Sequence, residues 1–183
     1  MTAPGRVEGG DRLRLFLALP LPDAVLDPLE AWQRAQLDGG RLVARDHLHV
    51  TLAFLGSRPA AELAGITRAL REAAARAGRP LLPVSAYRET RSVGMLVLDD
   101  EDGRAGALAA DLHDRLERLG VYRREARPWL AHVTVLRFRE RPRLRPPLPD
   151  LEPFAPSEAA AYLSRLHPSG ARYEVLESVP LGG

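Results

Sequence analysis

Cysteine is absent from this chain of 183 residues, which excludes disulfide bonds and thiolate metal sites. Lysine is absent as well, so all 26 basic residues are arginines. No apolar run approaches the roughly 20 residues that a membrane-spanning helix needs. Residues 1–11 are polar and lack the charged-then-apolar build of a secretory signal, so we interpret them as a flexible N-terminal leader. These absences predict a cytoplasmic protein that does not interact with a membrane.

The net charge of +2 is small and excludes a polybasic protein that coats nucleic acid. A GC-rich genome, which favours arginine codons, explains most of the arginine total. The guanidinium group still offers a planar fork of donors suited to phosphate. The places where the arginines cluster are therefore more informative than their number.

Strand and helix patterns are mixed along the chain, which has the 45% hydrophobic and 27% charged content of a globular protein. Alternation and short apolar runs predict strands at 12–20, 48–55, 81–87, 93–98, 130–138, 159–166 and 173–179. Helical spacing predicts helices from Asp23 to about Leu37, from Pro59 to about Ala77, and over 108–119. Two units, each with a helix and a histidine-containing strand, form a weak internal repeat.

The most informative pattern is a pair of His-x-Thr triplets in strands. Residues 47–56 read HLHVTLAFLG, and residues 131–137 read AHVTVLR. Because strand side chains alternate between two faces, each histidine shares a face with its threonine. The predicted groove faces carry His49, Thr51 and Ala53, or His132 and Thr134, and the predicted buried faces carry Leu48, Val50, Leu52 and Phe54, or Ala131, Val133 and Val135. Gly56 is expected to close the first strand.

Two such strands facing one groove would place two imidazoles and two hydroxyls around a small ligand. This arrangement suits in-line displacement at the phosphorus of a 2′,3′-cyclic phosphate, where a base activates water and an acid protonates the departing ribose oxygen. Histidine has an unperturbed pKa of about 6.5 and serves either purpose near neutrality. The threonine hydroxyls would donate to the non-bridging oxygens as charge builds there. Such a reaction requires no metal.

Chance is a poor explanation for the two triplets. With five histidines and five threonines in the chain, a given histidine has roughly a 3% chance of a threonine two places on. Two such pairs among five histidines then amount to roughly a 1% event, before a strand context is required.

The motifs and their surroundings resemble the 2H phosphoesterase superfamily, and within it the RNA 2′,3′-cyclic phosphodiesterases, also called 2′-5′ RNA ligases. The resemblance covers nearly the whole chain. RLFLALPLPDAV is similar to the family's opening strand and turn, HLHVTLAFLG and RPWLAHVTVLR to its two motifs, and LSRLHPSGARYEVL to its closing hairpin. The paired motifs are specific for the superfamily, whereas the flanks indicate the subfamily.

The resemblance implies an α+β fold, in which two pseudo-symmetric lobes of antiparallel sheet with outer helices enclose a central groove. We expect residues 12–183 to form this single bilobal domain. The family's activity is hydrolysis of RNA 2′,3′-cyclic phosphodiester ends to 2′-phosphomonoesters. Neither a cofactor nor a metal is implied.

The resemblance also implies a role for each motif residue. His49 would be the proton donor and His132 the proton acceptor. Thr51, Thr134 and Arg137 would bind the substrate phosphate. For Arg137, a structural salt bridge is an equally good interpretation.

Some positions depart from the family pattern or fall outside it. Ala131 stands where the family commonly has proline, and His167 stands where its closing turn commonly has threonine. We interpret His167 as a surface turn residue, His47 as a residue at the rim of the groove, and His113 as a solvated helix residue.

Five arginines alternate along the second motif's strand and its exit: Arg137, Arg139, Arg141, Arg143 and Arg145. They would share a face if the strand continued, although nearby prolines limit its length. One interpretation is a contact with the RNA backbone beside the groove. The other, slightly favoured, is a solvated, stiff loop. Trp129 and Phe138 flank the motif and would either stack on a base or pack in the core.

Two other functions fit the same residues. One is a module that binds RNA ends or joins them reversibly in 2′-5′ linkage. The other is a metal site on His49 and His132, disfavoured because no carboxylate or cysteine recurs at ligand spacing near both. The expected partners are RNA ends or small cyclic nucleotides. A monomer is expected because one chain supplies both motifs.

Overall fold

The computed structural model describes residues 11–182. Its strands are β1 (Arg12–Pro20), β2 (Arg41–Leu42), β3 (His49–Pro59), β4 (Val84–Glu89), β5 (Val93–Leu98), β6 (His132–Arg137), β7 (Glu158–His167) and β8 (Gly170–Pro180). Its helices are α1 (Asp23–Gln36), α2 (Leu63–Arg76) and α3 (Arg104–Arg118), with 3-10 turns at Arg45–His47 and Ala60–Glu62. Across the described part of the chain, no helix has the length and apolar character to cross a bilayer.

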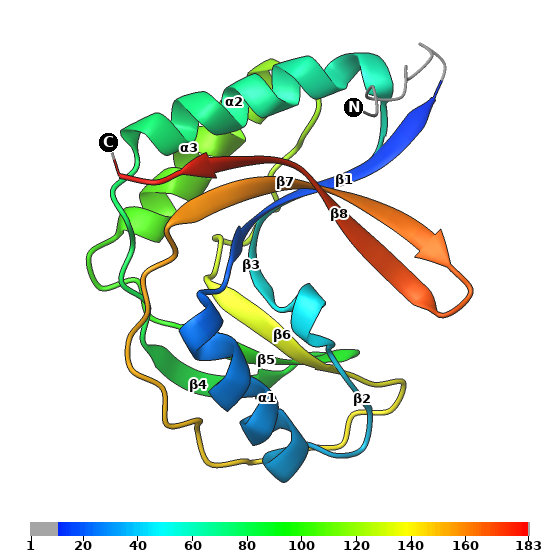
Figure 1. Ribbon diagram of the computed structural model, residues 1–183, viewed down its shortest axis with the longest axis vertical. Coiled ribbons are helices and arrows are strands. Elements are labelled where there is room, and N and C mark those ends of the chain that lie inside the picture. The colour runs from blue at the N-terminus through cyan, green and yellow to red at the C-terminus, as the bar shows by residue number, and fades with distance from the viewer. Residues whose placement is uncertain (1–10, 183) are drawn as a thin grey trace, which may run out of the picture.

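All strands join one antiparallel sheet in the order β4-β5-β6-β3-β1-β7-β8, with β2 paired to β6. The sheet has two halves, which meet where β3 pairs with β6 at a single position, Val50 with Val133. One lobe contains β3, β1, β7 and β8, and the other contains β2, β4, β5 and β6 (Figure 1). The expected α+β fold with two antiparallel lobes is confirmed.

Two helices cross between the lobes: each follows a strand of one lobe in the chain but packs on the other lobe. Helix α1 follows β1 but lies against the second lobe (Figure 1). There the Trp32 ring meets the Tyr87 ring of β4 edge to face, with 6.4 Å between centroids. Helix α3 follows β5 but packs against β3 and α2 of the first lobe. The two sequence units therefore interlock in space, and neither forms a lobe by itself.

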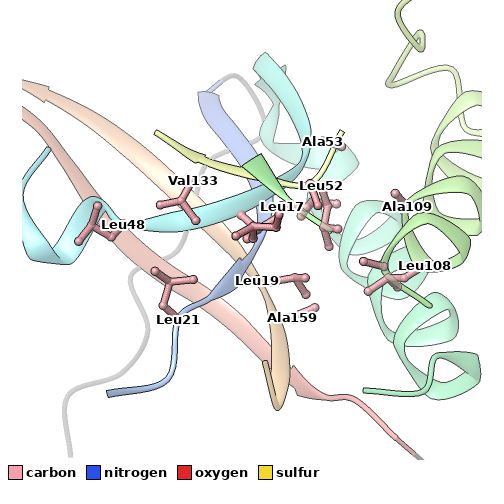
Figure 2. Close-up of a cluster of buried hydrophobic side chains, with 14 of the residues drawn as sticks. Leu17, Leu19, Leu21, Leu48, Leu52, Ala53, Leu108, Ala109, Val133 and Ala159 are labelled. Atoms are coloured by element: carbon pink, nitrogen blue, oxygen red, sulfur yellow. The ribbon is translucent and has the colours of Figure 1, made fainter. Parts of the chain in front are cut away.

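One hydrophobic core connects the sheet to the helices. In Figure 2, Leu52 and Ala53 of β3 lie on the side of the cluster nearest Leu108 and Ala109 of α3. Apolar residues spaced three or four apart give α3 the stripe that makes this contact. The core thus anchors the first motif strand directly to a helix.

Some element boundaries differ from the sequence prediction. Strand β3 does not close at Gly56, which takes a left-handed φ of 66° while pairing with β1 continues to Pro59. The helix predicted from Pro59 begins with a 3-10 turn. Of the expected leader, residues 1–10 lie outside the described residues. The carbonyl of Asp11 accepts a hydrogen bond from the Ala60 amide.

Candidate active site

The four motif side chains line one groove of about 490 Å³: His49, Thr51, His132 and Thr134. Their arrangement follows from the pairing of Val50 with Val133, the residues between His and Thr in each motif. Both valines are buried, so the flanking His and Thr side chains point to the opposite face. Antiparallel pairing then sets each histidine beside the threonine of the other motif. Alternation predicts that the His and Thr of each motif share one face of their strand, and the structure brings both pairs into one groove.

Arginines give the groove a positive character. Arg14, Arg41 and Arg137 line it, and the lining includes no Asp or Glu of the described residues. Arg14 and Arg41 are not predicted from the sequence, since no local motif distinguishes them from the other arginines. Among residues 11–182, no three His, Asp or Glu side chains cluster as a metal site requires. The groove is thus suited to an anion.

A β-bulge follows the threonine of each motif. The pairing of β3 with β1 skips Leu52, and the pairing of β6 with β5 skips Val135. An extra residue shifts the alternation by one from that point on. The third residue after each threonine, Phe54 in β3 and Arg137 in β6, therefore faces the groove. The two motifs match in geometry over at least six residues each.

The prediction that Phe54 packs in the core with Leu48, Val50 and Leu52 is wrong. Phe54 is 51% exposed, whereas Ala53 is buried. The bulge at Leu52 explains the reversal, because simple alternation counts no extra residue. Arg14 lies over the Phe54 ring, with its guanidinium carbon 4.9 Å from the ring centroid.

His49 lies among aromatic rings at the inner end of the groove. It stacks on Phe16 at 5.0 Å between ring centroids and meets Tyr173 edge-on at 5.9 Å. Burial is the main reason that the pKa of His49 falls to about 4, and a ring hydrogen bond to the His47 backbone opposes part of the shift. Its Nε2 lies 3.1 Å from Thr51 Oγ1. In the neutral ring, Nε2 accepts this hydrogen bond and the threonine hydroxyl donates it.

His132 is oriented by the backbone of its own strand. Its Nδ1 lies 2.8 Å from the carbonyl oxygen of Leu130. Because a carbonyl only accepts, Nδ1 carries the hydrogen and the neutral ring has its lone pair at Nε2. This tautomer is the one a general base needs.

The remaining histidines occupy three different environments. His47 lines the groove with its ring tilted by 32° against that of Tyr173, at 4.1 Å between centroids, and burial lowers the pKa of His47. His167 lies at the exposed turn of the β7–β8 hairpin, as predicted. The prediction of a solvated His113 is wrong, because this residue is buried and its Nε2 lies 2.7 Å from the Leu52 carbonyl oxygen. Helical spacing would have indicated this, since position 113 lies on the apolar stripe of α3.

The arginines after the second motif do not continue its strand, because β6 ends at Arg137. None of the ion pairs within residues 11–182 includes Arg137 itself. Arg141 instead pairs with Glu89 at 3.2 Å. Trp129 and Phe138 are largely structural: Trp129 Nε1 donates to the Thr51 carbonyl at 3.1 Å, and Phe138 is buried.

The chain is similar in sequence and fold to known phosphoesterases. A family described as LigT-like phosphoesterase matches residues 19–88. The RNA 2′,3′-cyclic phosphodiesterase of Escherichia coli (strain K12) is 29% identical over 171 residues, covering 90% of this chain and 94% of that protein. The crystal structure of E. coli LigT in apo form superimposes with a TM-score of 0.84 at 26% identity, covering 95% of this chain and all of the other.

A second solved structure, TT0787 of Thermus thermophilus, has a TM-score of 0.79 at 30% identity. The match covers 92% of this chain and 98% of that chain. Fold and sequence are similar over nearly the whole length of these relatives. The chain therefore carries a LigT-like phosphoesterase domain of the 2H type, and it is a hydrolase.

Proposed function

We propose that this enzyme hydrolyses 2′,3′-cyclic phosphodiester ends of RNA to 2′-phosphomonoesters without a metal. The observation that carries the proposal is the pair of His-x-Thr motifs set side by side in an arginine-lined groove. The relative from E. coli is an RNA 2′,3′-cyclic phosphodiesterase, and E. coli LigT has been crystallised with 3′-AMP. A cyclic phosphate would lie between the two imidazoles, as in-line displacement requires.

His132 acts as the proton acceptor in this proposal. Its Nδ1–H is held by the Leu130 carbonyl, so Nε2 is the atom that takes a proton from water. The resulting hydroxide oxygen forms a bond to phosphorus, and the bond from phosphorus to the ribose 3′ oxygen breaks. The product carries a 2′-phosphate and a 3′-hydroxyl.

His49 acts as the proton donor to the departing 3′ oxygen. With a pKa of about 4 it is neutral near pH 7 in the empty groove, and a neutral ring cannot serve as the acid. The negative phosphate of the substrate would raise the pKa of His49, because a nearby anion favours the imidazolium form. Nearby positive groups, including Arg137, lower the His49 pKa, and a phosphate between them offsets that repulsion.

The threonines and Arg137 hold the phosphate in this scheme. In the empty site, the Thr51 hydroxyl donates to His49 Nε2. Once His49 is protonated, its Nε2 can no longer accept this hydrogen bond. The Thr51 hydroxyl is then free to donate to a non-bridging oxygen. Thr134 and Arg137 face the same groove from the second motif. Their donors would stabilise charge that grows on the phosphoryl oxygens.

The proposal is tested with a short RNA that ends in a 2′,3′-cyclic phosphate, incubated with the enzyme and a chelator. We expect a 2′-phosphate product at an unchanged rate when the chelator is present. Binding without turnover would favour an RNA-end binding module, and loss of activity on chelation would favour a metal enzyme. A 3′-phosphate product would require new roles for His49 and His132.

Substitution of either histidine tests its role. His49→Ala and His132→Ala should each lower kcat/KM by at least about a hundredfold, as loss of a general acid or base does. His167→Ala is the matched control, since His167 lies at the exposed hairpin turn and should leave the rate unchanged. A rate near the wild-type value in either test variant would refute the role assigned to that residue.

A monomeric state and a cytoplasmic location remain predictions. One chain supplies both halves of the groove, so a second copy is not needed to complete it. Light scattering at micromolar concentration checks the oligomeric state, and cell fractionation checks the location.

A further inference from the structure

The carbonyl groups of the two bulge residues accept hydrogen bonds from buried helix side chains. Each bulge residue is buried, so its carbonyl needs a donor from the protein interior. The carbonyl of Leu52 receives His113 Nε2 at 2.7 Å. The carbonyl of Val135 receives Gln33 Nε2 at 2.9 Å and the Val43 amide at 3.0 Å.

The two donors occupy corresponding places in the fold. Gln33 is on α1 and His113 is on α3, the two helices that cross from one lobe to cover the other. Both side chains are buried, with 2% and 5% exposure, among a core made almost entirely of apolar groups. A buried polar group in such a core is tolerated when it is hydrogen-bonded. Here each side chain donates to a bulge carbonyl, and Gln33 also donates to the Val43 carbonyl at 3.1 Å.

Loss of either donor would affect the groove through strand geometry. Without His113 the buried Leu52 carbonyl loses its side-chain donor, and without Gln33 the Val135 carbonyl keeps only the Val43 amide. Loss of such a buried hydrogen bond disfavours the bulge and favours a return to the regular register. Regular alternation would turn the third residue after the threonine away from the groove. That residue is Phe54 in the first motif and Arg137 in the second. The threonine three residues before it would shift as well.

We infer that His113 and Gln33 are positioning residues, each of which holds one motif in its groove-facing geometry by fixing the bulge after its threonine. His113 serves the Thr51 motif and Gln33 serves the Thr134 motif. This inference rests on the proposed function for its activity readout. Neither side chain is among the groove-lining residues, so each acts through the strand that it bonds.

The first test removes each donor and then restores it. His113→Leu and Gln33→Leu should lower kcat/KM for the cyclic-phosphate RNA by about 10- to 100-fold, the range that small displacements of catalytic groups produce. His113→Gln and Gln33→His exchange the two donors between the lobes and should recover most of the lost rate. Thr67→Val is the matched control, because Thr67 is also a buried polar helix residue but bonds within α2, and this variant should keep the wild-type rate.

The second test distinguishes positioning from general stability through double-mutant cycles. In a Thr51→Val background, His113→Leu should lower kcat/KM by a further factor of less than about three, because its effect passes through the first motif. In a Thr134→Val background, His113→Leu should keep its full effect. Gln33→Leu should follow the opposite pattern. Equal effects of each Leu variant in both backgrounds would overturn the inference, as would full activity in both Leu variants.

Crystal structures of the Leu variants give a readout independent of catalysis. We expect Phe54 to leave the groove in His113→Leu and Arg137 to leave it in Gln33→Leu. If the wild-type enzyme lacks phosphodiesterase activity, the proposed function fails while these structures still decide the positioning role. Should a Leu variant not fold, His113→Asn or Gln33→Asn replaces it, since the shorter amide falls short of the bulge carbonyl. Unchanged bulges in these variants would refute the inference.

Discussion

The proton on His49 is the feature of the groove that depends most on what is bound there. Stacked rings and burial hold the pKa of this residue near 4, below the usual value of a histidine. The proposed acid role therefore requires the substrate phosphate to supply the charge that raises it. His132 needs no such help, because its tautomer already presents Nε2 as an acceptor.

Anion binding should accordingly be coupled to proton uptake at His49. At about pH 6 the free groove holds a neutral His49, and a bound anion should convert it to the imidazolium form, with uptake approaching one proton. Sulfate is the suitable probe because it does not titrate near this pH. Calorimetry of sulfate binding in buffers with different ionisation enthalpies measures the uptake.

The matched control for this measurement is His49→Gln, which keeps a polar side chain of similar length but cannot titrate. We expect the variant to bind sulfate with little proton uptake. Full uptake in the variant would assign the proton to another group and contradict the explanation of the acid role.

At the scale of elements, residues 138–145 after β6 form an arginine-rich segment, here called the strap, that is bonded to the end of β4. Glu89 at the end of β4 is almost fully buried and accepts hydrogen bonds from the backbone amides of Arg143 and Leu144 at 2.9 and 2.8 Å. Arg141 and the Tyr87 hydroxyl also donate to it. Burial alone would raise the pKa of Glu89, but these hydrogen bonds outweigh it and lower the pKa.

Glu89→Gln should release this strap. We expect the free energy of unfolding to fall by about 1–3 kcal/mol at neutral pH, the usual cost of disrupting buried hydrogen bonds. The Arg143–Leu144 bond should also become more sensitive to trypsin, since Glu89 holds the Leu144 amide and the bonds after Arg141 and Arg145 precede proline. Urea unfolding and timed proteolysis measure the two effects.

The pH dependence of this effect has a definite sign. Because the folded-state pKa of Glu89 is lowered from 4.5, its stabilising contribution is present above that value and is lost as the pH falls through the folded pKa. The wild type and Glu89→Gln should therefore converge in stability in acid. Glu174→Gln, which removes an exposed partner of Arg165, is the control expected to change little.

At the scale of the whole molecule, the net charge is small although the groove is positively charged. Arg14, Arg41 and Arg137 line the groove in a protein whose net charge is only +2. RNA binding should then depend on salt through these few contacts and not through a general surface field.

Arg41→Gln tests this view of the groove. The slope of log affinity against log salt should become less steep by about 0.7, the value for one phosphate contact on a single strand. Equilibrium binding of a cyclic-phosphate RNA in the inactive His132→Ala background measures the slope. Arg165→Gln, on the hairpin and paired with Glu174, should leave it unchanged. An unchanged slope for Arg41→Gln would mean that this arginine does not contact the RNA backbone.

Much of the molecule could be predicted from local pattern alone. Period-two alternation placed His49 with Thr51 and His132 with Thr134, because the face of a strand depends only on neighbouring residues. Most strands and all three helices follow from short-range spacing and turn residues. The likeness of the two motifs and their flanks to a known family supplied the two-lobed α+β architecture and the assignment of donor and acceptor roles.

Tertiary structure alone decided where that alternation is interrupted. The bulges at Leu52 and Val135 depend on pairing with other strands and on donors from His113 and Gln33, which lie 61 and 102 residues away in the chain. No local pattern contains that information, so alternation alone predicts Phe54 in the core. The buried position of His113 does follow from the helical spacing of α3, but its hydrogen-bond partner does not. The sequence by itself thus determined that each motif presents His and Thr together. Long-range hydrogen bonds decided the geometry that also turns Phe54 and Arg137 toward the groove.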